Sequence, residues 1–204
     1  FRVLKRKFFP IQMSPSPFEY VSVLISIILG MGIAQLITGV AGIILRWDNV
    51  KMYWPHMVIV LLVFVLHVQD WWATYELRTF TYWRLPTFLF IIVYPVNLYF
   101  LARLLFPVRW AARDNDLRNF YFENFRKIYF FMMLLPLHSI IDNYFIGGYR
   151  LGDQYLQFVL LAILSFIVTI NRKDEWIHKS LAIVFLLICA TTFGVAWNIF
   201  LISG

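Results

Sequence analysis

The sequence carries little charge: Asp, Glu, Lys and Arg make up only 14% of its 204 residues. Soluble domains average about 25% charged residues, and their surface helices need one polar face. Here 61% of the residues are hydrophobic, and the charged residues gather between the apolar stretches rather than within them. The shortage of charge therefore excludes an ordinary water-soluble fold.

Cysteine and catalytic motifs are also scarce. The single cysteine, Cys189, excludes an intrachain disulfide. The sequence contains no phosphate-binding loop, dinucleotide-binding glycine pattern, nucleophile elbow or His-Glu-x-x-His zinc motif. It also lacks a potassium-channel filter sequence and the regular arginine ladder of a voltage sensor. We therefore predict that the protein is not an enzyme, and the sequence names no cofactor and no specific metal.

Long apolar stretches are what the chain does have. A run of about 20 apolar residues matches the roughly 30 Å hydrocarbon core of a membrane. The sequence predicts an all-α integral membrane protein, a bundle of six transmembrane helices with short connections in one domain over residues 18–204. Residues 1–17 form a separate basic segment containing Pro and Ser. The predicted spans are residues 18–45, 54–77, 85–106, 128–146, 155–170 and 177–202.

The connection over residues 107–127 is the longest and the most polar. Asp116 and Asn119 are residues that cap helix N-termini. We therefore expect a helix to begin outside the membrane near Asp116 and to run on into the fourth span.

The net charge of +7 is better explained by contact with lipid headgroups than by binding to nucleic acid. Lys and Arg lie beside the spans, where they meet anionic headgroups and set the orientation. We expect membrane lipids as partners, no nucleic acid, and a multi-pass protein of the bacterial inner membrane. Most basic residues lie where odd-numbered spans end, which favours termini outside the cytoplasm; the basic N-terminal segment argues the other way.

The first span has a small residue at every fourth position. Such a ridge lets the backbone of another helix approach closely. Two interpretations remain open: the ridge packs against the protein's own helices, or it forms a seam with other membrane chains or with copies of itself. The ridge comprises Ser22, Ser26, Gly30, Ala34, Thr38 and Gly42.

Two predicted spans carry a histidine followed by an aspartate, His67 with Asp70 and His138 with Asp142. Spacings of three and four place each pair on one helix face. Both spans are even-numbered and run in the same direction, so both pairs fall in the same half of the membrane. Glu19 begins the first span on that side. Ionisable groups inside spans are costly and are functional candidates by default.

Several chemistries fit these five residues. A carboxylate near a histidine can pass protons, the set could bind a divalent metal, and two histidines could ligate a haem. The alternative is structural anchoring. His56 and His178 begin spans and are expected at the membrane interface. Pro95 and Pro136 are expected to kink their helices and free a carbonyl.

From these features we expect a non-enzymatic membrane subunit that packs through helix–helix and lipid or cofactor contacts in a larger complex. One alternative is a small oligomeric channel or transporter that handles protons or cations. A second is a subunit that binds a metal, haem or quinone.

Overall fold

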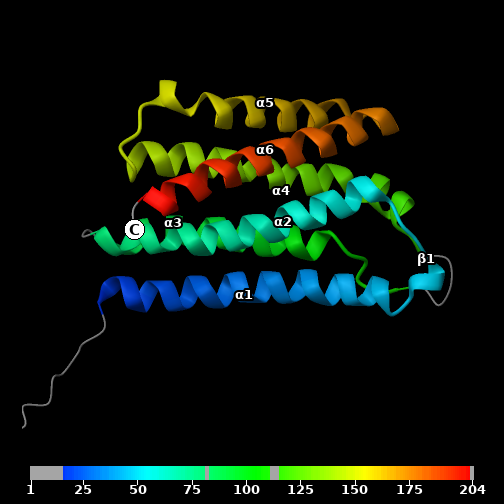
Figure 1. Ribbon diagram of the computed structural model, residues 1–204, viewed down its shortest axis with the longest axis horizontal. Coiled ribbons are helices and arrows are strands. Elements are labelled where there is room, and N and C mark those ends of the chain that lie inside the picture. Colours follow the sequence, from blue (N-terminus) through cyan, green and yellow to red (C-terminus); the bar gives the residue numbers. More distant parts are fainter. Residues whose placement is uncertain (1–15, 81–82, 111–114, 203–204) are drawn as a thin grey trace, which may run out of the picture.

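Helices run side by side along the long axis of the molecule in the computed structural model (Figure 1). The structure describes residues 16–80, 83–110 and 115–202, so residues 1–15 of the predicted N-terminal segment lie outside it. The α-helices of these residues are α1 (Pro17–Ile44), α2 (Trp54–Ala73), α3 (Leu85–Leu104), α4 (Leu117–Phe145), α5 (Tyr155–Ile170) and α6 (Glu175–Ile202). Short 3-10 turns follow α1 (Trp47–Asn49), follow α2 (Thr74–Thr79) and precede α5 (Leu151–Gln154).

Side-chain caps fix where two helices begin. The Glu19 amide donates to Ser16 Oγ at 3.2 Å, and the Ser16 amide donates to the Glu19 carboxylate at 2.7 Å. This reciprocal capping box starts α1. At α4, Asp116 Oδ1 accepts from the Arg118 and Asn119 amides at 2.8 and 3.0 Å. The predicted helix start at Asp116, ahead of the fourth apolar stretch, is confirmed.

The helical class expected from the sequence is also confirmed. Within the described residues, five helical segments are long and apolar enough to cross a membrane: Pro17–Ile44, Trp54–Thr79, Leu85–Leu104, Leu117–Phe145 and Leu151–Ile170. Helix α6 covers the sixth predicted stretch, and its passage across a membrane remains a prediction.

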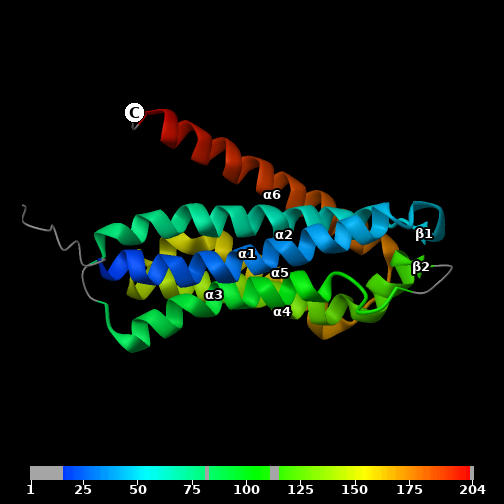
Figure 2. The ribbon, with the colours of Figure 1, turned by 90° about the horizontal axis from the view of Figure 1, so that it is seen from below.

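The helices pack mainly in neighbouring pairs. Helix α1 lies along α3, α4 lies along α5, and α3 joins the two pairs. In Figure 1, α1 and α5 are at opposite edges of the molecule. Helix α6 packs on α2 near its own start, and its C-terminal half stands away from the other helices (Figure 2).

A two-residue parallel strand pair ties the loops together at the end of the molecule where α1 finishes. In β1 (Val50–Lys51), Val50 pairs with Asn115 of β2 (Asn115–Asp116), and Lys51 pairs with Asp116. The pairing fastens the α1–α2 connection to the start of α4.

Glycines of α1 make close contacts inside the bundle. A Cβ at Gly32 would overlap the His67 imidazole, and one at Gly39 would overlap the Phe106 ring. Glycine at these positions lets large side chains rest directly on the α1 backbone. The two prolines inside α3 and α4, Pro95 and Pro136, are buried, and both helices continue through them.

Candidate functional site

The small-residue ridge of α1 lies mostly on the outside of the molecule. Its four central members, Ser26, Gly30, Ala34 and Thr38, are exposed. A Cβ at Gly30 would meet nothing within 4 Å. Only the ends of the ridge turn inward: Ser22 is half-buried, and Gly42 is buried against Trp110. The chain's own helices therefore leave the centre of the ridge uncovered.

His67 is fully buried and faces α1. Its Nδ1 lies 2.7 Å from the Val63 carbonyl oxygen. A carbonyl can only accept, so Nδ1 carries the hydrogen. Nε2 rests on Gly32 and has no hydrogen-bond partner among the described residues. The sequence placed His67 beside Asp70, but its ring nitrogens are directed to its own backbone and to α1.

His138 joins α4 to α3. Its Nε2 donates to the Phe90 carbonyl at 2.9 Å. The ring stacks on Phe90 with 4.2 Å between centroids, and the Tyr94 ring lies 5.4 Å away edge-on. The polar edge of His138 is thus held by the α3 backbone, in the turns that precede Pro95.

The two aspartates of the predicted pairs lie within electrostatic range of each other. The charge of Asp142 acts on Asp70, and both aspartates act on Tyr94. Asp142 also interacts with His138. One Asp70 carboxylate oxygen is buried with no hydrogen-bond partner among the described residues. We call Asp70, Tyr94, His138 and Asp142, contributed by α2, α3 and α4, the acidic cluster.

Glu19, the fifth residue of the predicted site, takes part in a helix cap. Its carboxylate accepts the Ser16 amide in the capping box that starts α1. A local helix-capping interaction thus accounts for this acid, and it does not need a place in the acidic cluster.

The histidines as placed do not fit a metal or haem site. In the ranges that the structure describes, no group of three His, Cys, Asp or Glu side chains is arranged to hold a metal ion. His67 and His138 each use one ring nitrogen on a backbone carbonyl, and they pack against different helices. Two imidazoles cannot flank one haem iron from these positions.

The other two histidines, which were expected at the membrane interface, are buried within the protein. His56 and His178 both have 0% exposed surface. His56 Nε2 donates to the Leu105 carbonyl at 2.8 Å, and its ring packs edge-on against Phe106, Phe120 and Tyr121. His56 therefore joins the start of α2 to the end of α3.

His178 ends a chain of buried hydrogen bonds. Its Nε2 donates to the Arg172 carbonyl at 3.0 Å, so the neutral ring must accept at Nδ1. The Tyr121 hydroxyl, 2.8 Å away, donates to it. Tyr121 in turn accepts from the Tyr129 hydroxyl at 3.0 Å. Tyr129, Tyr121 and His178, the tyrosine–histidine chain, thus have a fixed donor order.

Tyr53 closes this aromatic region from the start of α2. Its ring lies 5.3 Å from that of Tyr121. Burial raises the pKa of the Tyr53 hydroxyl to about 12, and the charge of Glu175 adds to the rise. One signal could have revealed the region from sequence: beyond the Asp116 cap, Tyr121, Phe125 and Tyr129 recur every fourth residue, which predicts one aromatic helix face.

In comparisons with protein-family models, with curated proteins and with solved structures, nothing matches this chain.

Proposed function

We propose that the protein is a non-enzymatic integral membrane subunit whose α1 ridge packs against a helix of another chain. The observation that carries the proposal is the outward position of Ser26, Gly30, Ala34 and Thr38. The proposed site of action is a membrane, with the bacterial inner membrane as the expected one.

Membrane insertion is supported by the apolar outer surface of the helices. Large side chains such as Ile37, Leu89 and Phe166 are 58%, 54% and 64% exposed. Monomeric soluble proteins rarely expose contiguous apolar patches of more than a few hundred Å². Lipid tails are the natural solvent for such a surface.

Within lipid, an exposed ridge of small residues has a specific physical meaning. The hydrophobic effect gives no attraction between helices there, so association depends on close van der Waals contact and on hydrogen bonds between helices. Large exposed side chains, Ile27, Met31 and Ile37, flank the small residues. The small residues therefore offer a strip of α1 along which the backbone of a second helix can approach closely.

The chain's own packing does not need the centre of the α1 ridge. The close internal contacts of α1 are made through Gly32, Gly39 and Gly42. Helix α1 therefore has one set of small residues for packing inside the bundle and a second set that is free to pack against a helix outside it.

Gly30→Leu is expected to release the protein from its partner, because the leucine would hold the partner's backbone away from the centre of the ridge. The free space at Gly30 means that the fold itself should tolerate the side chain. The measurement is the mass of the particle extracted from native membranes in mild detergent. We expect at least about a tenfold loss of the larger particle, because overpacking a close contact costs roughly 1–3 kcal/mol and about 1.4 kcal/mol corresponds to a factor of ten.

Gly194→Leu is the matched control, since a Cβ at Gly194 on α6 also meets nothing within 4 Å. It should leave the larger particle intact. If Gly30→Leu and Gly194→Leu have equal effects, or neither has one, the ridge is not the seam.

The acidic cluster supports a second candidate function, proton handling. Two carboxylates that act on each other at membrane depth cannot both ionise without a large cost. One of the two aspartates, Asp70 or Asp142, is therefore expected to hold a proton, with Tyr94 and His138 in the same cluster. Such a site could take up and release protons from one side of a membrane.

Asp142→Asn tests this second function in liposomes that contain the purified protein. If the cluster carries protons, the mutation should abolish acidification driven by a pH gradient, because the amide cannot exchange a proton. Glu19→Gln is the control, since an amide at that position still caps α1. Equal flux in wild type and Asp142→Asn, or no flux in wild type, would remove proton handling and leave the packing role unaffected.

A further inference from the structure

Helices α3 and α4 carry the same short sequence pattern. Residues 90–97 of α3 read FIIVYPVN, and residues 131–138 of α4 read FMMLLPLH. In both, a phenylalanine lies five residues before a proline, and a side chain with an N–H donor, Asn97 or His138, lies two residues after it. The two helices therefore have matched groups on either side of their prolines.

These matched groups bind each other reciprocally. Asn97 Nδ2 donates to the Phe131 carbonyl at 3.0 Å, and His138 Nε2 donates to the Phe90 carbonyl at 2.9 Å. A carbonyl oxygen has two lone pairs, so it can accept such a bond in addition to its own helix bond. At 1.5 Å per residue, the seven-residue spacing within each pattern places the two bonds about 10 Å apart along the helices.

A proline lies between the two bonds in each helix. Pro95 and Pro136 are buried inside α3 and α4. A proline has no N–H, so the carbonyls four residues earlier, at Ile91 and Met132, lose their helical donor. Each helix therefore bends most easily at this point. The result is a pair of matched bending points framed by two interhelical hydrogen bonds.

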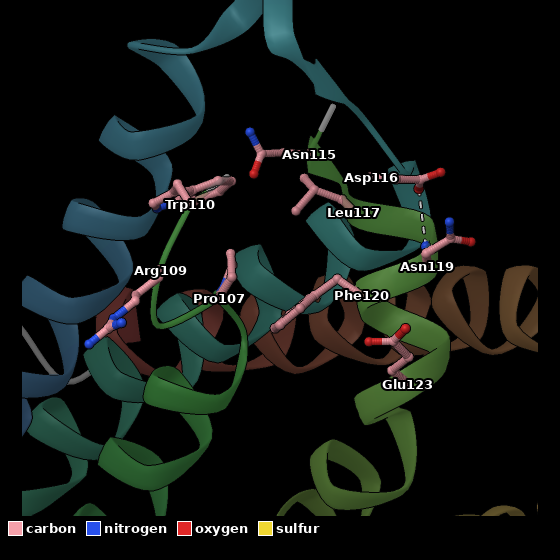
Figure 3. A pocket seen from close by; sticks show the side chains of 9 residues that line it. All are labelled: Pro107, Arg109, Trp110, Asn115, Asp116, Leu117, Asn119, Phe120 and Glu123. Carbon is pink, nitrogen blue, oxygen red and sulfur yellow. Dashed lines mark hydrogen bonds between the residues drawn. The ribbon is translucent and has the colours of Figure 1, made fainter. Parts of the chain in front are cut away.

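Further contacts hold α3 and α4 in place at the end where α1 finishes. Figure 3 shows Pro107, in the loop after α3, and Phe120, in the first turns of α4, beside the same pocket. His56 of α2 bonds to the Leu105 carbonyl at the end of α3 and packs edge-on against Phe120. The β1–β2 pair fastens the start of α4 as well. This end of the helix pair is therefore tied on several sides.

The opposite end of the pair is held more weakly. Among the described residues, the His138–Phe90 bond is the last hydrogen bond between α3 and α4 in that direction. Beyond it, α3 extends to Leu85 and α4 runs on to Phe145. Asp142 of the acidic cluster lies one turn past His138 on α4. A single hydrogen bond therefore links α3 and α4 beside the acidic cluster.

From this arrangement we infer that the His138–Phe90 contact is a clasp that opens and closes beside the acidic cluster, with the two prolines as hinges and the Asn97 bond as the fixed point. Opening separates the first turn of α3 from the last turns of α4 and admits water to Asp142. Hinges are a few residues that absorb a change in backbone angles. The inference holds whether or not the cluster carries protons, because its test measures amide exchange rather than flux.

Hydrogen–deuterium exchange of the full-length protein in detergent, read by mass spectrometry, tests the clasp. Backbone amides exchange faster in segments that open locally. His138→Phe keeps a flat ring for stacking but removes the N–H donor. We expect residues 85–92 and 139–145 to exchange about fivefold faster in this variant, the effect expected for one hydrogen bond. Residues 98–104 and 117–131 should keep the wild-type rate.

Two variants are matched to His138→Phe. His138→Asn retains an N–H donor of the kind that residue 97 uses in the equivalent bond, so it should exchange more slowly than His138→Phe over residues 139–145. Asn97→Leu removes the equivalent bond at the tied end, and it should leave residues 139–145 at the wild-type rate.

Pro136→Ala tests the hinge itself. Added to His138→Phe, it restores an amide for the Met132 carbonyl, so the end of α4 should bend less and residues 139–145 should exchange severalfold more slowly. Exchange that is not slowed by Pro136→Ala would overturn the hinge. Unchanged exchange in His138→Phe, an equal rise over residues 117–131, or an equal rise in Asn97→Leu would show that His138–Phe90 is not a clasp.

Discussion

Tyr121→Phe is expected to lower the free energy of unfolding by about 3 kcal/mol, because it leaves two buried polar groups without partners, each costing roughly 1–3 kcal/mol. The lost hydroxyl donates to His178 Nδ1 and accepts from Tyr129. Both bonds lie in a region with no exposed surface, so water cannot replace them. The measurement is unfolding by SDS titration in mixed micelles.

Tyr129→Phe is the matched comparison, since it removes the same atom from the same type of ring. Here only a donor to Tyr121 is lost, and the bond from Tyr121 to His178 remains. The expected loss is about 1 kcal/mol, the typical net value of one hydrogen bond. Equal losses for the two variants, or a larger loss for Tyr129→Phe, would contradict the donor order of the tyrosine–histidine chain.

Gly32→Ala is expected to destabilise the fold by about 2 kcal/mol, within the roughly 1–3 kcal/mol cost of overpacking a core. The new methyl group would overlap the His67 ring, which its bond to the Val63 carbonyl holds in place. Alanine improves helix propensity by about 1 kcal/mol, but the displaced imidazole outweighs that gain.

Gly30→Ala, two residues away, is expected to change the stability in the opposite direction. Nothing lies near its new methyl group, so only the gain in helix propensity remains. Its stability in the same SDS titration should equal or exceed that of the wild type. If the Gly32→Ala variant were as stable as the Gly30→Ala variant, the placement of His67 against the α1 backbone would be wrong.

Local sequence signals predicted the helices well. Apolar length fixed their approximate positions, and Asp116 predicted the early start of α4. Sequence could not tell which face of α1 would lie inside, because small residues occur on two of its faces. The choice depends on His67 and Phe106, large side chains that reach the backbone of α1 at Gly32 and Gly39. A periodic pattern along one helix does not predict such contacts between distant segments.

The predicted polar site was recovered only in part for the same reason. Helix spacing placed His67 beside Asp70, yet His67 bonds to its own backbone and faces α1. The electrostatic coupling of Asp70 with Asp142 and Tyr94 depends on how α2, α3 and α4 pack. Similarly, His56 and His178 are next to span ends in the sequence, but the aromatic first turns of α4 help to bury them.

The most direct test of the central proposal is the mass of the wild-type particle extracted from its native membrane, measured by light scattering with the detergent contribution subtracted. An outward ridge that packs against another chain predicts a protein mass well above the 24.3 kDa of one chain. A protein mass equal to that of a single chain, at every detergent concentration that keeps the protein folded, would contradict the proposal.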